Sequence, residues 1–256
     1  MFAEKSISKI FSCLLVFIFL FVGVLPVQAE TPSSPMYASG DFLWAKKVDG
    51  ANYNGLAYKI VVDSSGNIYT VGLFAGTADF DPGVGTFNMT SVGQEDIFIS
   101  KLDSNANFVW AKSIGGTSSD YGTDIAIDSS GNVYTTGSFD GTADFNPDAG
   151  TYNLTSAGGA SDIFISKLNS GGGFVWAKSM GGTHEDVGIG ITLDSSGNLY
   201  TTGFFFGTVD FDPGPGIYNL TSESSSSGGF GTIFISKLEN DVLPGPFKLF
   251  LPLILR

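Results

Sequence analysis

A sequence repeat with a period of 65 or 66 residues constrains this chain more than any other feature. One motif reads DSSGNIYTVG at 63–72, and it returns as DSSGNVYTTG at 128–137 and as DSSGNLYTTG at 194–203. A second motif, GTADFDPG at 76–83, has counterparts at 141–148 and 207–214. A period this regular predicts structural units that stack on one another or surround a common axis.

Each unit is expected to consist of short antiparallel strands. In the middle copy we expect strands at 125–128, 133–139, 162–168 and 174–180, with an additional extended piece at 152–156. Ser129, Ser130 and Gly131 form the first turn, because Gly adopts positive φ without steric cost. The 35 Gly and 23 Phe residues occur among short apolar runs, which is typical of strands joined by tight turns.

The strand expected at 162–168, DIFISKL, is apolar on both faces. Ile163 and Ile165 point to one side and Phe164 points to the other. A sheet with one wet face would alternate apolar and polar residues, so this sheet needs neighbours on both sides. Four-stranded antiparallel sheets packed face to face are the blades of a β-propeller. The sequence therefore predicts an all-β, β-propeller-like array of three four-stranded antiparallel blades of about 66 residues.

The repeat also resembles the bacterial β-propeller repeats of the SBBP type. That family combines a D-x-x-GN-x-Y-x-TG hairpin with a D-x-F-[IV]-x-KL strand and a GG turn, and the resemblance covers roughly residues 40–239. In the middle copy the matching residues are Asp128, Gly131, Asn132, Tyr134, Gly137, Asp162, Phe164, Lys167, Leu168, Gly181 and Gly182. The motifs are structural, so the resemblance implies a fold and no particular activity.

One short motif is present once too often at the start of the repeat region and is absent at its end. FVWAK follows the DIFISKL strand at 108–112 and at 174–178, but no copy follows TIFISKL at 232–238. A related stretch, FLWAK, stands alone at 42–46. We expect the strand at 42–48 to complete the last blade beside 233–238, which would protect two sheet edges. Three blades are fewer than the usual four to eight, so either two chains build one ring of six, as a homodimer, or the units form an open arc.

Four segments are predicted from composition. Residues 1–29 read as a signal peptide: Lys5 and Lys9 precede an apolar run, and Val27-Gln28-Ala29 is a small-residue cleavage pattern, with an uncleaved anchor as the alternative. A linker at 30–39, the repeat domain at 40–239 and an apolar tail at 240–256 follow. The tail is too short to span a bilayer, so we expect no stable membrane span after cleavage. It is either a sorting or attachment signal or a strand that caps a blade edge.

The charge of the chain restricts its partners. Loss of residues 1–29 removes two Lys and one Glu, which takes the net charge from −13 to −14. Such a surface repels nucleic acid and anionic membranes. The only cysteine, Cys13, lies in the leader, so we expect no disulfide in the mature chain.

Paired acidic or amide residues in the excursion loops are the only candidate metal ligands. If each pair is extended, both oxygen-bearing side chains lie on one face and the intervening Phe turns inward. Calcium is bound by six to eight oxygens, however, and Asp-Pro-Gly is also good turn chemistry, so we expect no cofactor, with weak calcium binding as the alternative. The candidate residues are Asp79, Asp81, Asp144, Asn146, Asp210 and Asp212.

No constellation of catalytic residues is apparent. His184 is the only histidine, and we expect it to be a polar loop residue. Trp44, Trp110 and Trp176 could stack against sugars, but their apolar strands favour core packing. The N-x-T sequons at Asn88, Asn153 and Asn219 occupy one repeat position and are best explained by a copied strand.

We therefore expect an exported, non-enzymatic scaffold or binding module, secreted or at the cell surface, with an unknown protein or glycan ligand. The alternative is a secreted polysaccharide-active hydrolase that uses acidic residues. An exposed acidic pair present in only one repeat would favour the hydrolase.

Overall fold

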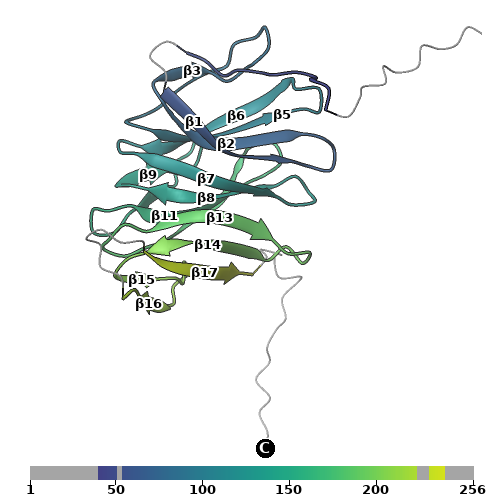
Figure 1. The fold of residues 1–256 in the computed structure, drawn as a ribbon. Helices are drawn as coiled ribbons and strands as arrows, with labels where there is room; N and C mark the ends of the chain where they lie inside the picture. Colours follow the sequence, from purple (N-terminus) through teal and green to yellow (C-terminus); the bar gives the residue numbers. More distant parts are fainter. Residues whose placement is uncertain (1–39, 51–53, 224–230, 240–256) are drawn as a thin grey trace, which may run out of the picture. The chain divides into compact units, whose positions relative to one another are not determined.

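The computed structural model describes residues 40–50, 54–223 and 231–239 (Figure 1). Two compact units are distinguished, Met1–Trp44 and Ala45–Arg256, and all strands belong to the second. Every strand pair is antiparallel. The described residues contain no helix, and therefore no helix that could cross a membrane. The expected leader, linker and tail, at 1–29, 30–39 and 240–256, lie outside the described residues.

The second repeat forms a four-stranded sheet, repeat sheet 2, in the order β12-β11-β8-β7. The strands β8 (Val133–Phe139), β11 (Asp162–Leu168) and β12 (Phe174–Met180) have the predicted bounds. Only β7 (Asp120–Ile127) differs, because it begins earlier than the expected strand at 125–128. The all-β, antiparallel organisation is thus confirmed.

The other two repeats reproduce this sheet with one difference. Repeat sheet 1 has the order β1-β2-β5-β6, and β6 also pairs with the β9-β10 hairpin of repeat two (Thr142–Asp144 and Asn153–Thr155), so that six strands form one hydrogen-bonded sheet. Within the described residues, repeat sheet 3 has three strands, β13-β14-β17. The bounds in repeat sheet 1 are β1 (Asn54–Val62), β2 (Ile68–Ala75), β5 (Asp96–Leu102) and β6 (Phe108–Gly116). Those in repeat sheet 3 are β13 (Val187–Leu193), β14 (Leu199–Phe205) and β17 (Thr232–Leu238).

Each Asp/Pro/Gly-rich excursion folds into a small hairpin, where the sequence predicted only one extended piece. The hairpins are β3 (Thr77–Asp79) with β4 (Asn88–Thr90), β9 (Thr142–Asp144) with β10 (Asn153–Thr155), and β15 (Thr208–Asp210) with β16 (Asn219–Thr221). As expected, Phe80, Phe145 and Phe211 turn inward and are buried. Phe145, for example, packs between Phe139 and Phe164, with ring centres 5.3 and 5.1 Å away.

The repeat sheets stack in sequence order (Figure 1), with β7 packed against β1 and β2, and β13 packed against β7 and β8. The predicted two-faced strand is confirmed in the first two sheets. In β11, Ile163, Phe164 and Ile165 are all fully buried. Burying each such side chain stabilises the fold by about 1.5–3 kcal/mol. Two core clusters join residues of neighbouring repeats, so a large part of this stabilisation comes from contacts between sheets.

The expected closure by the N-terminal strand is wrong for the single chain. Residues 41–48 form no strand, and among the described strands β17 pairs only with β14. The segment instead leads into a bridge between Asp49 and Asp79 at the first hairpin. No closed sheet forms among the described strands.

Candidate functional site

The most regular motif of the chain, DSSGN-x-Y, builds a turn. Asp128 Oδ1 accepts the N–H groups of Ser130 and Asn132 at 2.8 and 2.9 Å, and its Oδ2 accepts Asn132 Nδ2 at 2.7 Å and Tyr134 Oη at 3.3 Å. Gly131 has a φ of 79°, which explains why Gly stands there. These hydrogen bonds hold the pKa of Asp128 below its usual value despite partial burial. The motif is therefore structural.

The candidate calcium ligands are likewise engaged in their own loops. Asp79 Oδ1 accepts the N–H groups of Asp81 and Phe87 at 3.0 and 2.7 Å, and Asp81 Oδ1 accepts that of Gly83 at 2.8 Å. Asp144 with Asn146, and Asp210 with Asp212, repeat this arrangement. No group of three or more His, Cys, Asp or Glu side chains suited to a metal ion occurs within residues 40–50, 54–223 and 231–239. Each pair thus orders a turn, and weak calcium binding stays a prediction.

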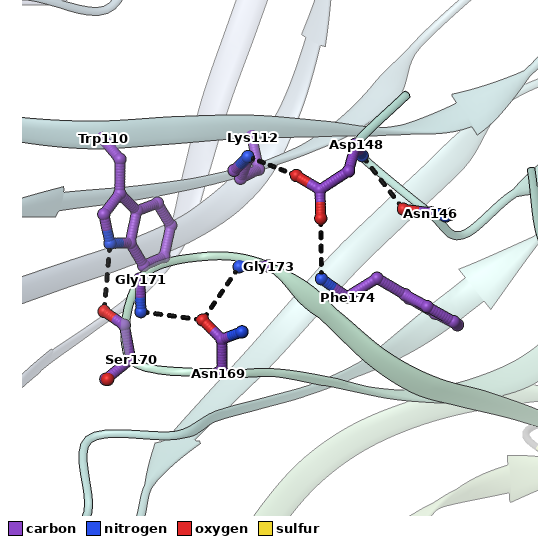
Figure 2. A network of polar contacts seen from close by, with 9 residues as sticks. All are labelled: Trp110, Lys112, Asn146, Asp148, Asn169, Ser170, Gly171, Gly173 and Phe174. Atoms are coloured by element: carbon purple, nitrogen blue, oxygen red, sulfur yellow. Dashed lines mark hydrogen bonds and ion pairs between the residues drawn. The ribbon is translucent and has the colours of Figure 1, made fainter. Parts of the chain in front are cut away.

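A polar clamp joins the first two repeats (Figure 2). On β6, the indole N–H of Trp110 donates to the Ser170 carbonyl at 3.3 Å, and Lys112 Nζ donates to Asp148 Oδ1 at 2.8 Å. Asp148 Oδ2 also accepts the N–H of Phe174 at 3.0 Å. Side chains of repeat one are therefore tied to the excursion loop and the β11–β12 turn of repeat two. Trp110 is buried, which confirms core packing for this residue.

Among the described residues, the equivalent place between repeats two and three lacks this clamp. Gly214 stands where repeat two has Asp148, so Lys178 has no counterpart of the clamp carboxylate. Trp176 Nε1 is buried and has no hydrogen-bond partner among the described residues, and Lys178 Nζ lies 5.9 Å from the centre of its ring. A cavity of about 210 Å³ occupies this place. It is lined by Tyr134, Trp176, Lys178, Leu199, Asp212 and Glu239, among others.

This cavity, called here the junction cavity, combines groups that bind polar ligands. It offers aromatic surface from Tyr134 and Trp176, an ammonium group from Lys178, and carboxylates from Asp212 and Glu239. Small-molecule sites in general pair an apolar lining with a few polar groups that fix orientation. The sequence analysis named Trp176 but missed Lys178. The FVWAK stretch is identical in repeats one and two, and the change from Asp148 to Gly214 at one repeat position could have shown that Lys178 loses the partner that Lys112 has.

Buried carboxyl pairs form a second feature that the sequence analysis missed. Asp96 and Asp120 meet between repeats one and two, where an added Cβ on Gly115 would stand 2.6 Å from Asp96 Oδ1 and 3.0 Å from Asp120 Oδ2. Burial raises the pKa of Asp120 to about 7, opposed by hydrogen bonds from the N–H groups of Gly116 and Asp140 and reinforced by the Asp96 charge. Asp96 Oδ1 is buried without a hydrogen-bond partner in the described part of the chain.

The same pair recurs between repeats two and three as Asp162 and Asp186. Burial, opposed by the hydrogen bond from the Ala157 N–H and reinforced by the charge of Asp186, raises the pKa of Asp162 to about 7. Burial also raises the pKa of Asp186 to about 6, although this carboxylate accepts the N–H groups of Phe206 and Gly182. Because all four carboxyl groups are buried, they are structural groups of the junctions and are closed to a substrate.

The remaining candidates lie apart from these features. His184 is exposed in the loop before β13, with its Nδ1 3.1 Å from Thr183 Oγ1. Asn88, Asn153 and Asn219 are exposed at the starts of β4, β10 and β16. Trp44 is exposed and outside any strand.

Comparison with known proteins agrees with the geometry of the repeat. Residues 109–146 match the SBBP family model, described as a β-propeller repeat. This match confirms the resemblance inferred from the motifs. It covers the clamp residues Trp110 and Lys112 and the strands β7 and β8.

Two curated relatives are similar to this chain. An uncharacterised WD repeat-containing protein of Acanthamoeba polyphaga mimivirus is 29% identical over 212 residues, which is 71% of this chain and 15% of that protein. The regulatory protein FlaEY of Caulobacter vibrioides is 28% identical over 128 residues, or 48% of this chain and 13% of that protein. The chain thus spans about one seventh of the length of either relative. The name of the first relative and the family model both describe repeat proteins, in agreement with the repeated units of this chain.

Proposed function

We propose that this chain is an exported, non-enzymatic β-propeller array of three blades that serves as a scaffold or binding module outside the cell. The observation that carries the proposal is the difference between the two junctions. A ligand can distinguish one repeat from another only where their side chains differ, and the junction cavity is such a place. There Lys178 faces Gly214, whereas Lys112 is paired with Asp148.

The placement of the carboxylates supports a non-enzymatic role. Glycoside hydrolysis requires two carboxyl groups that reach the scissile bond from a cleft. Two close carboxyl pairs, Asp96 with Asp120 and Asp162 with Asp186, are buried and occur at both junctions. They neither face solvent nor distinguish one repeat from the others, so they do not favour the hydrolase alternative.

Export is supported by the sequence alone. The leader at 1–29 and the acidic net charge of −13 suit a protein that is secreted or held at the cell surface. The WD repeat in the name of one relative also fits an array that presents binding surfaces. We expect the ligand to be a glycan or an extended peptide, because the junction cavity joins aromatic surface to charged groups of both signs.

A glycan array and a peptide array, probed with the purified exported chain, test the proposal together with a hydrolysis screen on the same ligands. We expect binding without release of products. Lys178→Met should weaken binding at least tenfold, whereas the matched variant Lys112→Met, at the closed junction, should leave it within about twofold. Release of reducing sugar ends would overturn the non-enzymatic reading, and equal effects of the two variants would overturn the junction cavity as the site.

A further inference from the structure

The first and last repeats present apolar faces that are buried everywhere else in the chain. At the first strand, Ile60 is 61% exposed, whereas its counterparts Ile125 and Ile191 are 2% and 6% exposed. At the last strand, Ile235 is 79% exposed, whereas Ile99 and Ile165 are fully buried. We call these the start face (Ile60 and Val62 on β1) and the end face (Ile233 and Ile235 on β17).

The internal junctions show how such faces fit together. Ile125 belongs to one core cluster with Ile97 and Ile99 of the preceding repeat. Ile191 belongs in the same way to a cluster with Ile163 and Ile165. The end face of each repeat therefore packs on the start face of the next, twice within this chain. The two open faces are the two halves of a third junction of the same kind.

We propose that a second copy of this chain fills this junction: the end face of one copy packs on the start face of the other, and two copies close a ring of six blades. A head-to-tail contact yields a ring if its rotation closes and a filament if it does not. Six lies within the usual range of four to eight blades, whereas three lies below it. The proposal concerns self-association and is independent of the ligand proposed above.

The polar groups of the two open faces are matched to each other. Each internal junction buries a carboxyl pair, contributed by the end face and by the start face of its two repeats. On the open end face Thr232 replaces Asp96 and Asp162, and on the open start face Gly55 replaces Asp120 and Asp186. Loss of only one partner would leave a lone carboxylate to be buried, at considerable cost. Since both are absent, the third junction can close without burying a charge.

The bridge made by Asp49 also fits this junction. Strands β6 and β12 each end in a contact with the next hairpin, through Gly115 with Asp144 and through Gly181 with Asp210. Asp49 makes the equivalent contact with Asp79. Asp49 therefore contacts the first hairpin in the way that the end of a fourth strand contacts the hairpin of the next repeat. In the ring, that preceding repeat is repeat sheet 3 of the second copy, whose fourth strand is missing beside β17.

The mass of the exported chain in solution is the first test. Sedimentation at micromolar concentration should give twice the mass of one chain. Ile60→Asp and Ile235→Asp should each shift the protein to a single chain with an unchanged circular dichroism spectrum, because each places a charge in the junction. The matched variants Val84→Asp and Ile217→Asp, at exposed loop positions, should stay dimeric. A single chain for the wild type would overturn the proposal, and larger species would overturn the closed ring.

A disulfide test leaves both apolar faces intact and so does not depend on variants that could unfold. Ser100 pairs with Ala111, and Ser166 with Ala177, across neighbouring strands. The equivalent pair in the third junction is Ser236 with Ala45. Opposite residues of antiparallel strands lie about 4.5–5.5 Å apart at Cα, which a disulfide can bridge.

Two single-cysteine chains, Ser236→Cys and Ala45→Cys, each with Cys13→Ser, should be mixed and oxidised. Doubling of the mass on a non-reducing gel is the expected result. As a control, Ser236→Cys mixed with Val84→Cys should not link. A mixture of Ser236→Cys and Ala45→Cys that does not link, while the double variant links within one chain, would mean closure within a single chain and would overturn the proposal.

Discussion

Replacing Asp162 by Asn should stabilise the protein at alkaline pH and not at acidic pH. Asp162 is almost fully buried in β11, its Oδ2 accepts the Ala157 N–H at 3.0 Å, and its Oδ1 has no hydrogen-bond partner within the described residues. An Asn side chain can keep its oxygen on the Ala157 N–H and carry no charge. The substitution therefore removes the cost of ionising a buried carboxyl group beside Asp186.

The size of the effect follows from the raised pKa. Burial, together with the Asp186 charge, raises the pKa of Asp162 to about 7 from its ordinary value of 3.8. A group with a raised pKa keeps its proton in the folded state while the unfolded chain loses it, so the stability of the wild type falls as pH rises from about 4 to 7. At about 1.4 kcal/mol per pKa unit the full loss is about 4 kcal/mol, and we expect about 2–4 kcal/mol after relaxation of the site.

Urea unfolding of wild type and Asp162→Asn at pH 4 and pH 8 measures this difference. The two proteins should be nearly equal at pH 4, and the variant should be more stable by about 2–4 kcal/mol at pH 8. A matched control is Asp212→Asn, because repeat two already has Asn146 at that position and the side chain only accepts a loop N–H. A gain for Asp162→Asn that is the same at both pH values, or absent at pH 8, would refute the argument.

Three further predictions follow from other parts of the chain. Trp110→Phe should cost about 1 kcal/mol more in unfolding free energy than Trp176→Phe, because Trp110 donates a hydrogen bond to the Ser170 carbonyl and Trp176 donates none within the described residues; equal costs would contradict the clamp. EDTA should lower Tm by less than about 10 °C, since a shift of that size corresponds to about 2–5 kcal/mol in a chain of this length and the loop carboxylates are already hydrogen-bonded. Intact mass of the exported product should show cleavage after Ala29, and a product that retains residues 1–29 would contradict the secretory reading.

Much of the fold was predictable because the signals are local. The Gly residues of the DSSGN turns and the short apolar runs predicted β8, β11 and β12 with their observed bounds. Ile163, Phe164 and Ile165 indicated a sheet buried on both faces, which the structure confirms. The earlier start of β7 and the small hairpins escaped prediction, because polar and Gly-rich strands lack an apolar period.

The candidate site was predictable only in part. Trp176 was recognised as an aromatic residue in a repeated strand, but its role depends on residues from the following repeat. Asp148 and Gly214 hold the same repeat position, and only their placement opposite Lys112 and Lys178 reveals that one junction is clamped and the other open. The carboxyl pairs were missed for a similar reason, since their members lie more than twenty residues apart in the sequence.

The sequence by itself determined the repeat, the strands and the orientation of their side chains, because these depend on residues within a few positions of each other. It also showed that a FLWAK stretch precedes the first repeat and that no FVWAK stretch follows TIFISKL in the third. The tertiary structure alone decided that residues 41–48 do not complete β17 in the same chain. The physical reason is that pairing between the first segment and β17 joins residues almost 190 positions apart, so it depends on how whole sheets stack and not on any local pattern.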